Sequence, residues 1–168
     1  MRMTPLIPAI AIAAAAFAFP AMSAENAQSF VDKAAVGGMF EVESSHLALK
    51  TSKDPDVKKF ADTMVSDHGK ANAELQVLAK DQGLTMPTKL DKKHETTLKS
   101  LQQAGANFDA PYIKAQLEGH MTTVKMFEQY AENGENKALQ TFAVKTLPTL
   151  KMHLDMIEKM GDRVGATK

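Results

Sequence analysis

The sequence has 168 residues, and its 20 lysines and arginines balance 20 aspartates and glutamates, so the formal net charge is zero at pH 7. That length suits a single domain. The neutral balance argues against a nucleic-acid partner, because nucleic-acid binding needs a basic surface. The chain has no cysteine, which excludes disulfides, thiol catalysis, zinc–thiolate sites and cysteine-ligated iron–sulfur clusters.

The first 24 residues have the order of an export signal. Arg2 is followed by an apolar run over residues 6–19, then by Pro20 and a short segment that ends at Ala24. This order is typical of a secretory signal peptide. We therefore expect residues 1–24 to be cleaved and residues 25–168 to form one helical-bundle domain, periplasmic or secreted and without membrane attachment. The alternative is an uncleaved anchor, although the run is shorter than the roughly 20 residues of a membrane-spanning helix.

Apolar residues recur at helical spacing in five stretches after this leader. The predicted helices cover about residues 26–51, 55–82, 90–103, 109–132 and 136–160. Asp54-Pro55 is typical of a helix start, and Gly83 and Gly161 are typical of helix ends. Because the first two helices, and also the last two, are joined by short links, each pair should form an antiparallel hairpin. The long connection between the pairs predicts an all-α, ferritin-like four-helix bundle with one additional short crossover helix.

Three histidines fall on the core-facing stripes of three different predicted helices. His68, His120 and His153 each hold a heptad position among apolar residues, and each lies near the middle of its helix. Facing helices of a bundle build metal sites at this depth, so the pattern favours a bound divalent ion, and histidine-rich donor sets suit zinc or copper. The alternative is three hydrogen-bonded core histidines in a structural or stress-response protein that binds no metal.

A carboxylate from the first helix would complete such a site, and two candidates are open. If Met39 and Val42 lie on the core-facing stripe, Glu43 flanks that stripe. If Gly38 and Ser45 lie there instead, Glu41 is favoured as the acid that faces the core. Glu43 also begins an E-x-x-H spacing, but the other helices supply no second such pair, which a di-iron site requires. Ferroxidase chemistry is therefore not supported, no catalytic residue is assigned, and a non-enzymatic role is favoured.

Several short segments resemble one known family. They are Phe40-Glu41-Val42-Glu43, Leu47-Ala48, Val57-Lys58-Lys59-Phe60-Ala61, Met64-Val65, Asp67-His68, Phe108-Asp109 with Tyr112, and Thr146-Leu147-Pro148-Thr149-Leu150 leading to His153. Over about residues 28–160 this ordered set resembles the exported bacterial proteins of the domain-of-unknown-function 4142 family. The resemblance implies a ferritin-like helical fold, export, and histidines at positions 68, 120 and 153 with acids near positions 41 and 43. The family carries no established activity, so no reaction follows.

Overall fold

The computed structural model describes residues 26–164, so the predicted signal peptide lies outside the described residues. The helices are α1 (Ala27–Thr51), α2 (Pro55–Asp81), α3 (Lys92–Gln103), α4 (Asp109–Asn133) and α5 (Lys137–Val164), and a single 3₁₀ turn, Gly105–Asn107, precedes α4. The prediction of an all-α bundle with one short additional helix is confirmed. Within residues 26–164, no helix combines the length and apolar character that crossing a lipid bilayer requires.

Local sequence signals set most of the helix boundaries. Asp54 caps α2 by accepting hydrogen bonds from the backbone N–H groups of Asp56 and Val57, and Pro55 occupies the first turn. Asp91 caps α3 in the same way, which places its start slightly after the predicted residue 90. Gly83 follows α2 with a φ of 67°, a conformation that glycine adopts without strain.

The end of the last helix differs from the prediction. The sequence predicts that Gly161 closes this helix, but α5 continues to Val164. Pro148 lies inside α5, and the helix continues on both sides of it. Gly161 is buried and does not adopt the positive φ that a terminating glycine uses. Gly161 therefore does not stop the helix.

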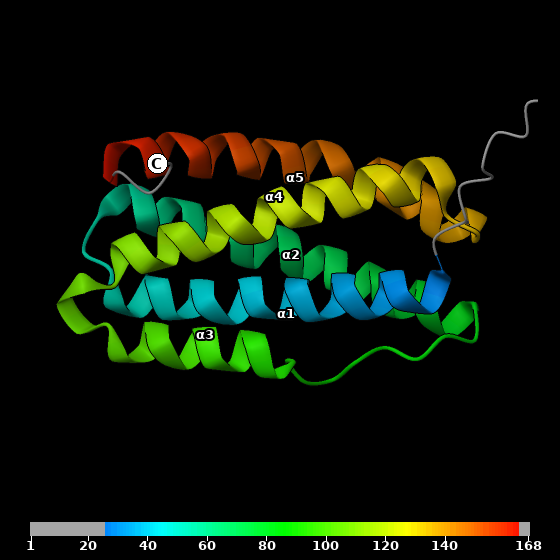
Figure 1. Ribbon diagram of the computed structural model, residues 1–168, viewed down its shortest axis with the longest axis horizontal. Helices are drawn as coiled ribbons and strands as arrows, with labels where there is room; N and C mark the ends of the chain where they lie inside the picture. Colours follow the sequence, from blue (N-terminus) through cyan, green and yellow to red (C-terminus); the bar gives the residue numbers. More distant parts are fainter. Residues whose placement is uncertain (1–25, 165–168) are drawn as a thin grey trace, which may run out of the picture.

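Two antiparallel hairpins build the bundle. α1 packs chiefly on α2 and α4 chiefly on α5, and the hairpins meet through the pairs α1–α4 and α2–α5. The connection from α2 to α4 returns along the length of the bundle, and α3 lies on the outside against α1 and the edge of α4 (Figure 1). The position of α3 at the side of the four core helices agrees with the predicted crossover role.

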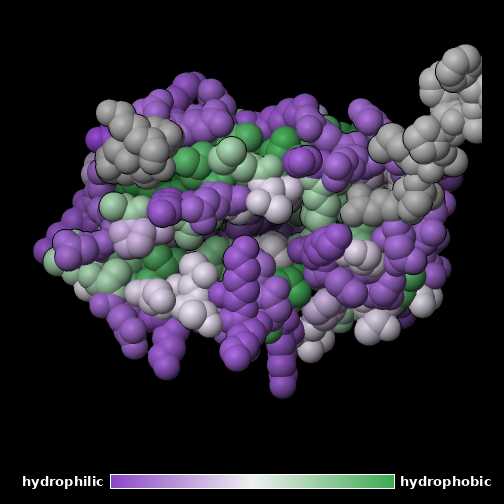
Figure 2. Space-filling model, in the orientation of Figure 1, coloured by the Kyte–Doolittle hydropathy of each residue, from purple (hydrophilic) through white to green (hydrophobic). Residues whose placement is uncertain are grey.

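The bundle interior has an apolar core at each end and a polar layer between them. One core gathers around Phe30, Phe127 and Tyr130, and the other around Phe60 and Tyr112. On the outside, hydrophilic side chains cover most of the face seen in Figure 2, and hydrophobic side chains show mainly in the furrows between helices. Polar groups at mid-depth are therefore shielded from solvent by apolar packing above and below.

Candidate metal centre

The polar layer contains the three histidines singled out by the sequence. His68 is on α2, His120 on α4 and His153 on α5, and their exposed fractions are 5%, 0% and 0%. Along each helix the histidine lies between residues of the two apolar cores; on α2, for example, Met64 precedes it and Leu75 follows it. The heptad spacing thus brings the three rings to one level of the bundle.

The three imidazoles face one another. Their ring centroids are 5.6 Å apart for His68 and His120, 5.3 Å for His68 and His153, and 5.6 Å for His120 and His153. One ring nitrogen from each histidine lies within 4.8 Å of the other two. Two nitrogens that bind one ion at about 2.1 Å lie at most about 4.2 Å apart, so small side-chain rotations suffice to bring the three onto a shared ion.

Each ring uses one nitrogen to bond outward from the cluster. His68 Nδ1 lies 2.9 Å from Glu41 Oε2, and His153 Nε2 lies 3.1 Å from Asp67 Oδ2. His120 Nδ1 lies 2.9 Å from the backbone carbonyl oxygen of Gln116. Since carboxylates and carbonyls only accept hydrogen bonds, these three nitrogens carry the protons. In the neutral rings the lone pairs therefore reside on the remaining nitrogens.

The remaining nitrogens are buried and have no hydrogen-bond partner among the described residues. They are His68 Nε2, His120 Nε2 and His153 Nδ1. A buried polar atom without a partner costs free energy, and native proteins rarely leave three in one place. Metal-binding histidines show the same arrangement, in which the outward N–H bonds a carboxylate or carbonyl and the other nitrogen binds the ion. The donor set therefore fits a metal ion that prefers imidazole nitrogen.

Glu41 supplies the negative charge of the cluster. It is 3% exposed, and its second oxygen, Oε1, lies 3.5 Å from His120 Nδ1. Burial alone would raise the pKa of the Glu41 carboxyl, but the charges of His68, His120 and His153, together with the hydrogen bond from His68, lower it to about 2. Glu41 is therefore ionised throughout the physiological pH range.

The three histidines differ in their readiness to lose a proton. Burial lowers the pKa of His120, and burial with the charges of His68 and His120 lowers the pKa of His153 to about 4. Burial also acts to lower the pKa of His68, but the Glu41 carboxylate outweighs it and the net direction is upward. Two of the three rings are thus held neutral, which is the form that binds metal ions.

A second set of polar contacts connects α1 with α4 below the histidines. The Gln116 side-chain amide donates to Ser44 Oγ at 2.9 Å, and Ser45 Oγ and the Tyr112 hydroxyl are 2.8 Å apart. These bonds fix the segment of α4 whose carbonyl at Gln116 orients His120.

The structure settles which acid of α1 faces the cluster. Gly38 and Ser45 are buried and Glu41 is buried with them, whereas Glu43 and His46 are exposed. The E-x-x-H spacing from Glu43 therefore lies on the surface, and Glu43 takes no part in the cluster. Close approach explains this orientation, because a Cβ at Gly38 would run into the side chain of Asn72 on α2. The metal-ligand role of the clustered residues remains a prediction.

Sequence reasoning missed two residues of the cluster. Asp67 precedes His68 and points toward α5, where it bonds His153, so adjacent residues on α2 serve two different histidines. Gln116 acts through its backbone carbonyl, and its position four residues before His120 was the signal available. Because successive helical residues are about 100° apart, an Asp next to a core His reaches the neighbouring helix.

These features define a class: an all-α bundle of two hairpins and an outer helix, with a buried histidine–carboxylate cluster at its centre. The chain belongs to the family described as Domain of unknown function (DUF4142), whose model matches residues 12–160. No curated protein sequence matches the chain.

Solved structures of CopM are similar in fold. CopM in the Cu(II)-bound form has a TM-score of 0.71 and 17% sequence identity, over 84% of this chain and 99% of that one. CopM in the Cu(I)-bound form has a TM-score of 0.68 and 16% identity, over 81% of this chain and 95% of that one. The form co-crystallised with silver has a TM-score of 0.68 and 16% identity, over 83% of this chain and 97% of that one. The likeness extends over nearly the whole CopM chain and establishes the CopM-like bundle.

Proposed function

We propose that this protein is an exported metal-binding protein that holds a copper ion at His68, His120 and His153. The observation that carries the proposal is the set of three buried ring nitrogens without partners, one on each histidine. A shared ion would satisfy all three at once. Core histidines that serve packing alone would bond both nitrogens or remain near solvent.

Copper is the metal that the donor set favours. Three imidazoles suit copper and zinc, and divalent copper binds a given nitrogen site more tightly than zinc does. The fold relative CopM is described in Cu(II)-, Cu(I)- and silver-bound forms, which supports a bundle of this shape accommodating such ions. Zinc is the competing ion that the experiment below must include.

The residues around the histidines prepare them for this role. Glu41 and Asp67 accept the outward N–H of His68 and His153, which orients those rings and makes their free nitrogens better donors. The carboxylate of Glu41 also offsets part of the positive charge that a cation brings into a buried site. This geometry suits a protein that binds a metal ion and releases it again. We assign no reaction to the site.

Copper titration of the untagged mature protein tests the proposal. We expect a single tightly bound equivalent of Cu(II), with nitrogen couplings in its electron paramagnetic resonance spectrum, and weaker binding of Zn(II). His120→Gln should abolish that equivalent, while His46→Gln, which changes an exposed histidine on α1, should leave it intact. Absence of binding at micromolar copper and zinc, or binding that survives His120→Gln, would support the alternative of a structural bundle with polar core histidines.

A further inference from the structure

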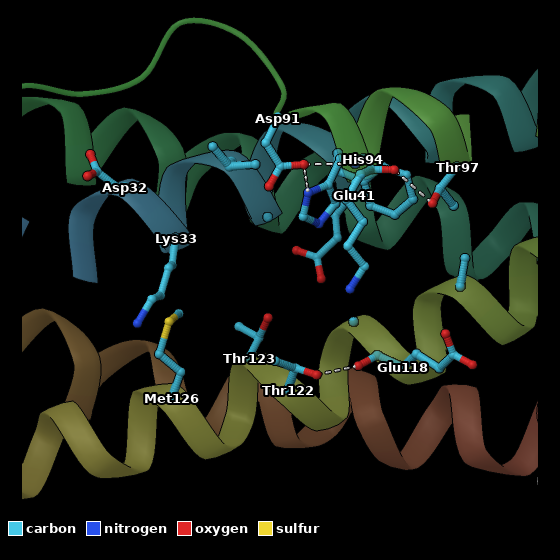
Figure 3. A pocket seen from close by; sticks show the side chains of 16 residues that line it. Asp32, Lys33, Glu41, Asp91, His94, Thr97, Glu118, Thr122, Thr123 and Met126 are labelled. Atoms are coloured by element: carbon cyan, nitrogen blue, oxygen red, sulfur yellow. Dashed lines mark hydrogen bonds and ion pairs between the residues drawn. The ribbon is translucent and has the colours of Figure 1, made fainter. Parts of the chain in front are cut away.

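A groove of about 620 Å³ opens on the face of the bundle where α1, α3 and α4 meet (Figure 3). Its lining includes Asp32 and Lys33 from α1, His94 from α3, and Glu118 and Met126 from α4. The Glu41 carboxylate points into this groove from α1, although the residue is almost completely buried. The same carboxylate therefore faces both the groove and the histidine cluster.

Glu41 also stands between the groove and the interior of the bundle. A second, inner void of about 20 Å³ is lined by Glu41 and His68, by residues of the apolar core, and by the half-buried side chains of Asn72 on α2 and Thr146 on α5. Two residues, Glu41 and Thr123, line both the groove and this inner void. Glu41 Oε2 bonds His68, while Oε1 lies 3.8 Å from the position that a Cβ at Gly119 of α4 would occupy. The Glu41 carboxylate thus lies where the groove adjoins the smaller void that reaches His68.

The charges around the groove favour a cation. Four carboxylates line it, those of Asp32, Glu41, Asp91 and Glu118, against the two ammonium groups of Lys33 and Lys93. Clefts lined by an excess of one charge raise the local concentration of ions of the opposite sign. His94 also lines the groove, and its Nδ1 lies 2.8 Å from Asp91 Oδ1. An incoming metal ion therefore meets carboxylates and an imidazole before it reaches Glu41.

Two glycines keep the groove open. At Gly119 an added Cβ would lie 3.8 Å from Glu41 Oε1, and at Gly37 it would have no atom within 4 Å. Both are interior positions of long helices, where glycine costs up to about 1 kcal/mol relative to alanine. Packing does not require these glycines, since a Cβ fits at either position. Without side chains at these two positions the groove stays open, and at Gly119 the open space adjoins the Glu41 carboxylate.

We propose that this groove is the entry and exit path of the metal ion and that Glu41 passes the ion between the groove and the three histidines. The inference rests on the proposed function, because it concerns the ion held by His68, His120 and His153. Its physical content is kinetic: an obstacle in a path slows binding and release by the same factor and leaves the equilibrium between them unchanged.

Filling the groove tests the inference. Gly119→Leu and Gly37→Leu place a side chain in the path from α4 and α1, and Gly69→Leu makes the same change at an exposed glycine of α2 outside the groove. Stopped-flow mixing with Cu(II) should show association and dissociation rates at least about tenfold lower in the groove variants. The dissociation constant should stay within about threefold, and Gly69→Leu should match the parent protein.

Each other outcome has a definite meaning. Unchanged association rates in a groove variant with the parent melting temperature would overturn the entry path, as would a fall in affinity without a slower association. If Gly119→Leu does not fold, Gly37→Leu carries the test, since a Cβ at Gly37 meets no atom within 4 Å. Absence of copper binding by the parent protein would overturn the proposed function itself, which equilibrium titration reveals before any rate is measured.

Discussion

Glu41 Oε2 accepts a hydrogen bond from His68 Nδ1 at 2.9 Å, and both side chains are almost fully buried, so a carboxylate–imidazole hydrogen bond joins α1 and α2 inside the bundle. The other carboxylate oxygen lies 3.5 Å from His120 Nδ1 on α4. A single carboxylate therefore contacts histidines from both hairpins. The charge of Glu41 therefore acts on both hairpins of the metal-free protein.

Replacing this carboxylate by an amide should destabilise the metal-free protein. In Glu41→Gln the hydrogen bond from His68 loses its charge assistance, and we expect a loss of about 1–3 kcal/mol in the free energy of unfolding at pH 7. Urea denaturation measures it. The matched variant Glu43→Gln changes an exposed acid two residues along α1, on the opposite side of the helix, and should stay within about 0.5 kcal/mol of the parent. Equal effects of the two changes would contradict the role assigned to Glu41.

The stability of the metal-free protein should fall as the pH drops from about 6.5 to about 4. The folded protein holds the pKa of His153 down at about 4, against the ordinary histidine value of 6.5. Over this window the unfolded chain binds a proton that the folded chain does not, so acid favours unfolding. We expect a loss of about 2–3 kcal/mol, in part from His120, whose pKa is lowered in the same direction.

Protonation of Glu41 should cause a second loss of stability at lower pH, by the same reasoning. Glu41 has its pKa lowered to about 2 from 4.5, so its stabilising contribution is present above about 4.5 and is lost as the pH falls toward 2. Urea titrations at a series of pH values show both steps. His153→Gln should flatten the upper one, whereas His46→Gln should leave the profile unchanged. A stability that stays constant between pH 6.5 and 4 would rule out a neutral buried His153.

Copper binding should weaken in acid and release protons. Metal ions bind the unprotonated imidazole nitrogen, so protons compete for the same atoms on His68, His120 and His153. Because the pKa of His68 is raised above 6.5 and that of His153 is lowered to about 4, we expect the dissociation constant to begin rising above pH 6.5 and to rise more steeply as the pH approaches 4. Isothermal titration calorimetry in two buffers of different ionisation enthalpy measures the protons released per copper ion, and an affinity independent of pH would contradict histidine coordination.

The sequence and the structure agree where a repeating pattern decides the outcome. His68, His120 and His153 sit on heptads that run for several turns, and such a pattern fixes both the buried face and the depth of each ring. Helix α1 carries no comparably regular stripe, so Glu41 and Glu43 could not be separated from spacing alone. Which of the two acids faces the core is linked to Gly38, where α1 approaches Asn72 of α2 closely. This is a contact between helices, and a local sequence pattern does not encode it.

That approach of α1 to α2 should be measurable as the difference between two glycine substitutions. Alanine at exposed Gly69 improves helix propensity and should stabilise the protein by up to about 1 kcal/mol. Alanine at Gly38 makes the same gain but meets the Asn72 side chain, so we expect Gly38→Ala to be about 1–2 kcal/mol less stable than Gly69→Ala. Adding Asn72→Ala should remove most of that gap. A gap that persists would mean that Asn72 is not the obstacle.

The export prediction has a direct test of its own. Cleavage after Ala24 would leave Glu25 as the first residue of the mature chain. Intact-mass spectrometry of protein recovered from the cell exterior or periplasm should give a mass that lacks residues 1–24. A mass that includes them, in protein extracted from membranes, would instead indicate an anchored form.

The histidine cluster draws on both halves of the chain: His68 comes from the α1–α2 hairpin, and His120 and His153 come from the α4–α5 hairpin. The hairpins touch each other less extensively than the helices within each hairpin do. If the chain is opened in the loop between α2 and α3, one fragment retains a single histidine of the cluster and the other retains two. A copper ion bound by all three histidines would then stabilise the association of the two fragments. The extent of fragment complementation would therefore report on copper binding.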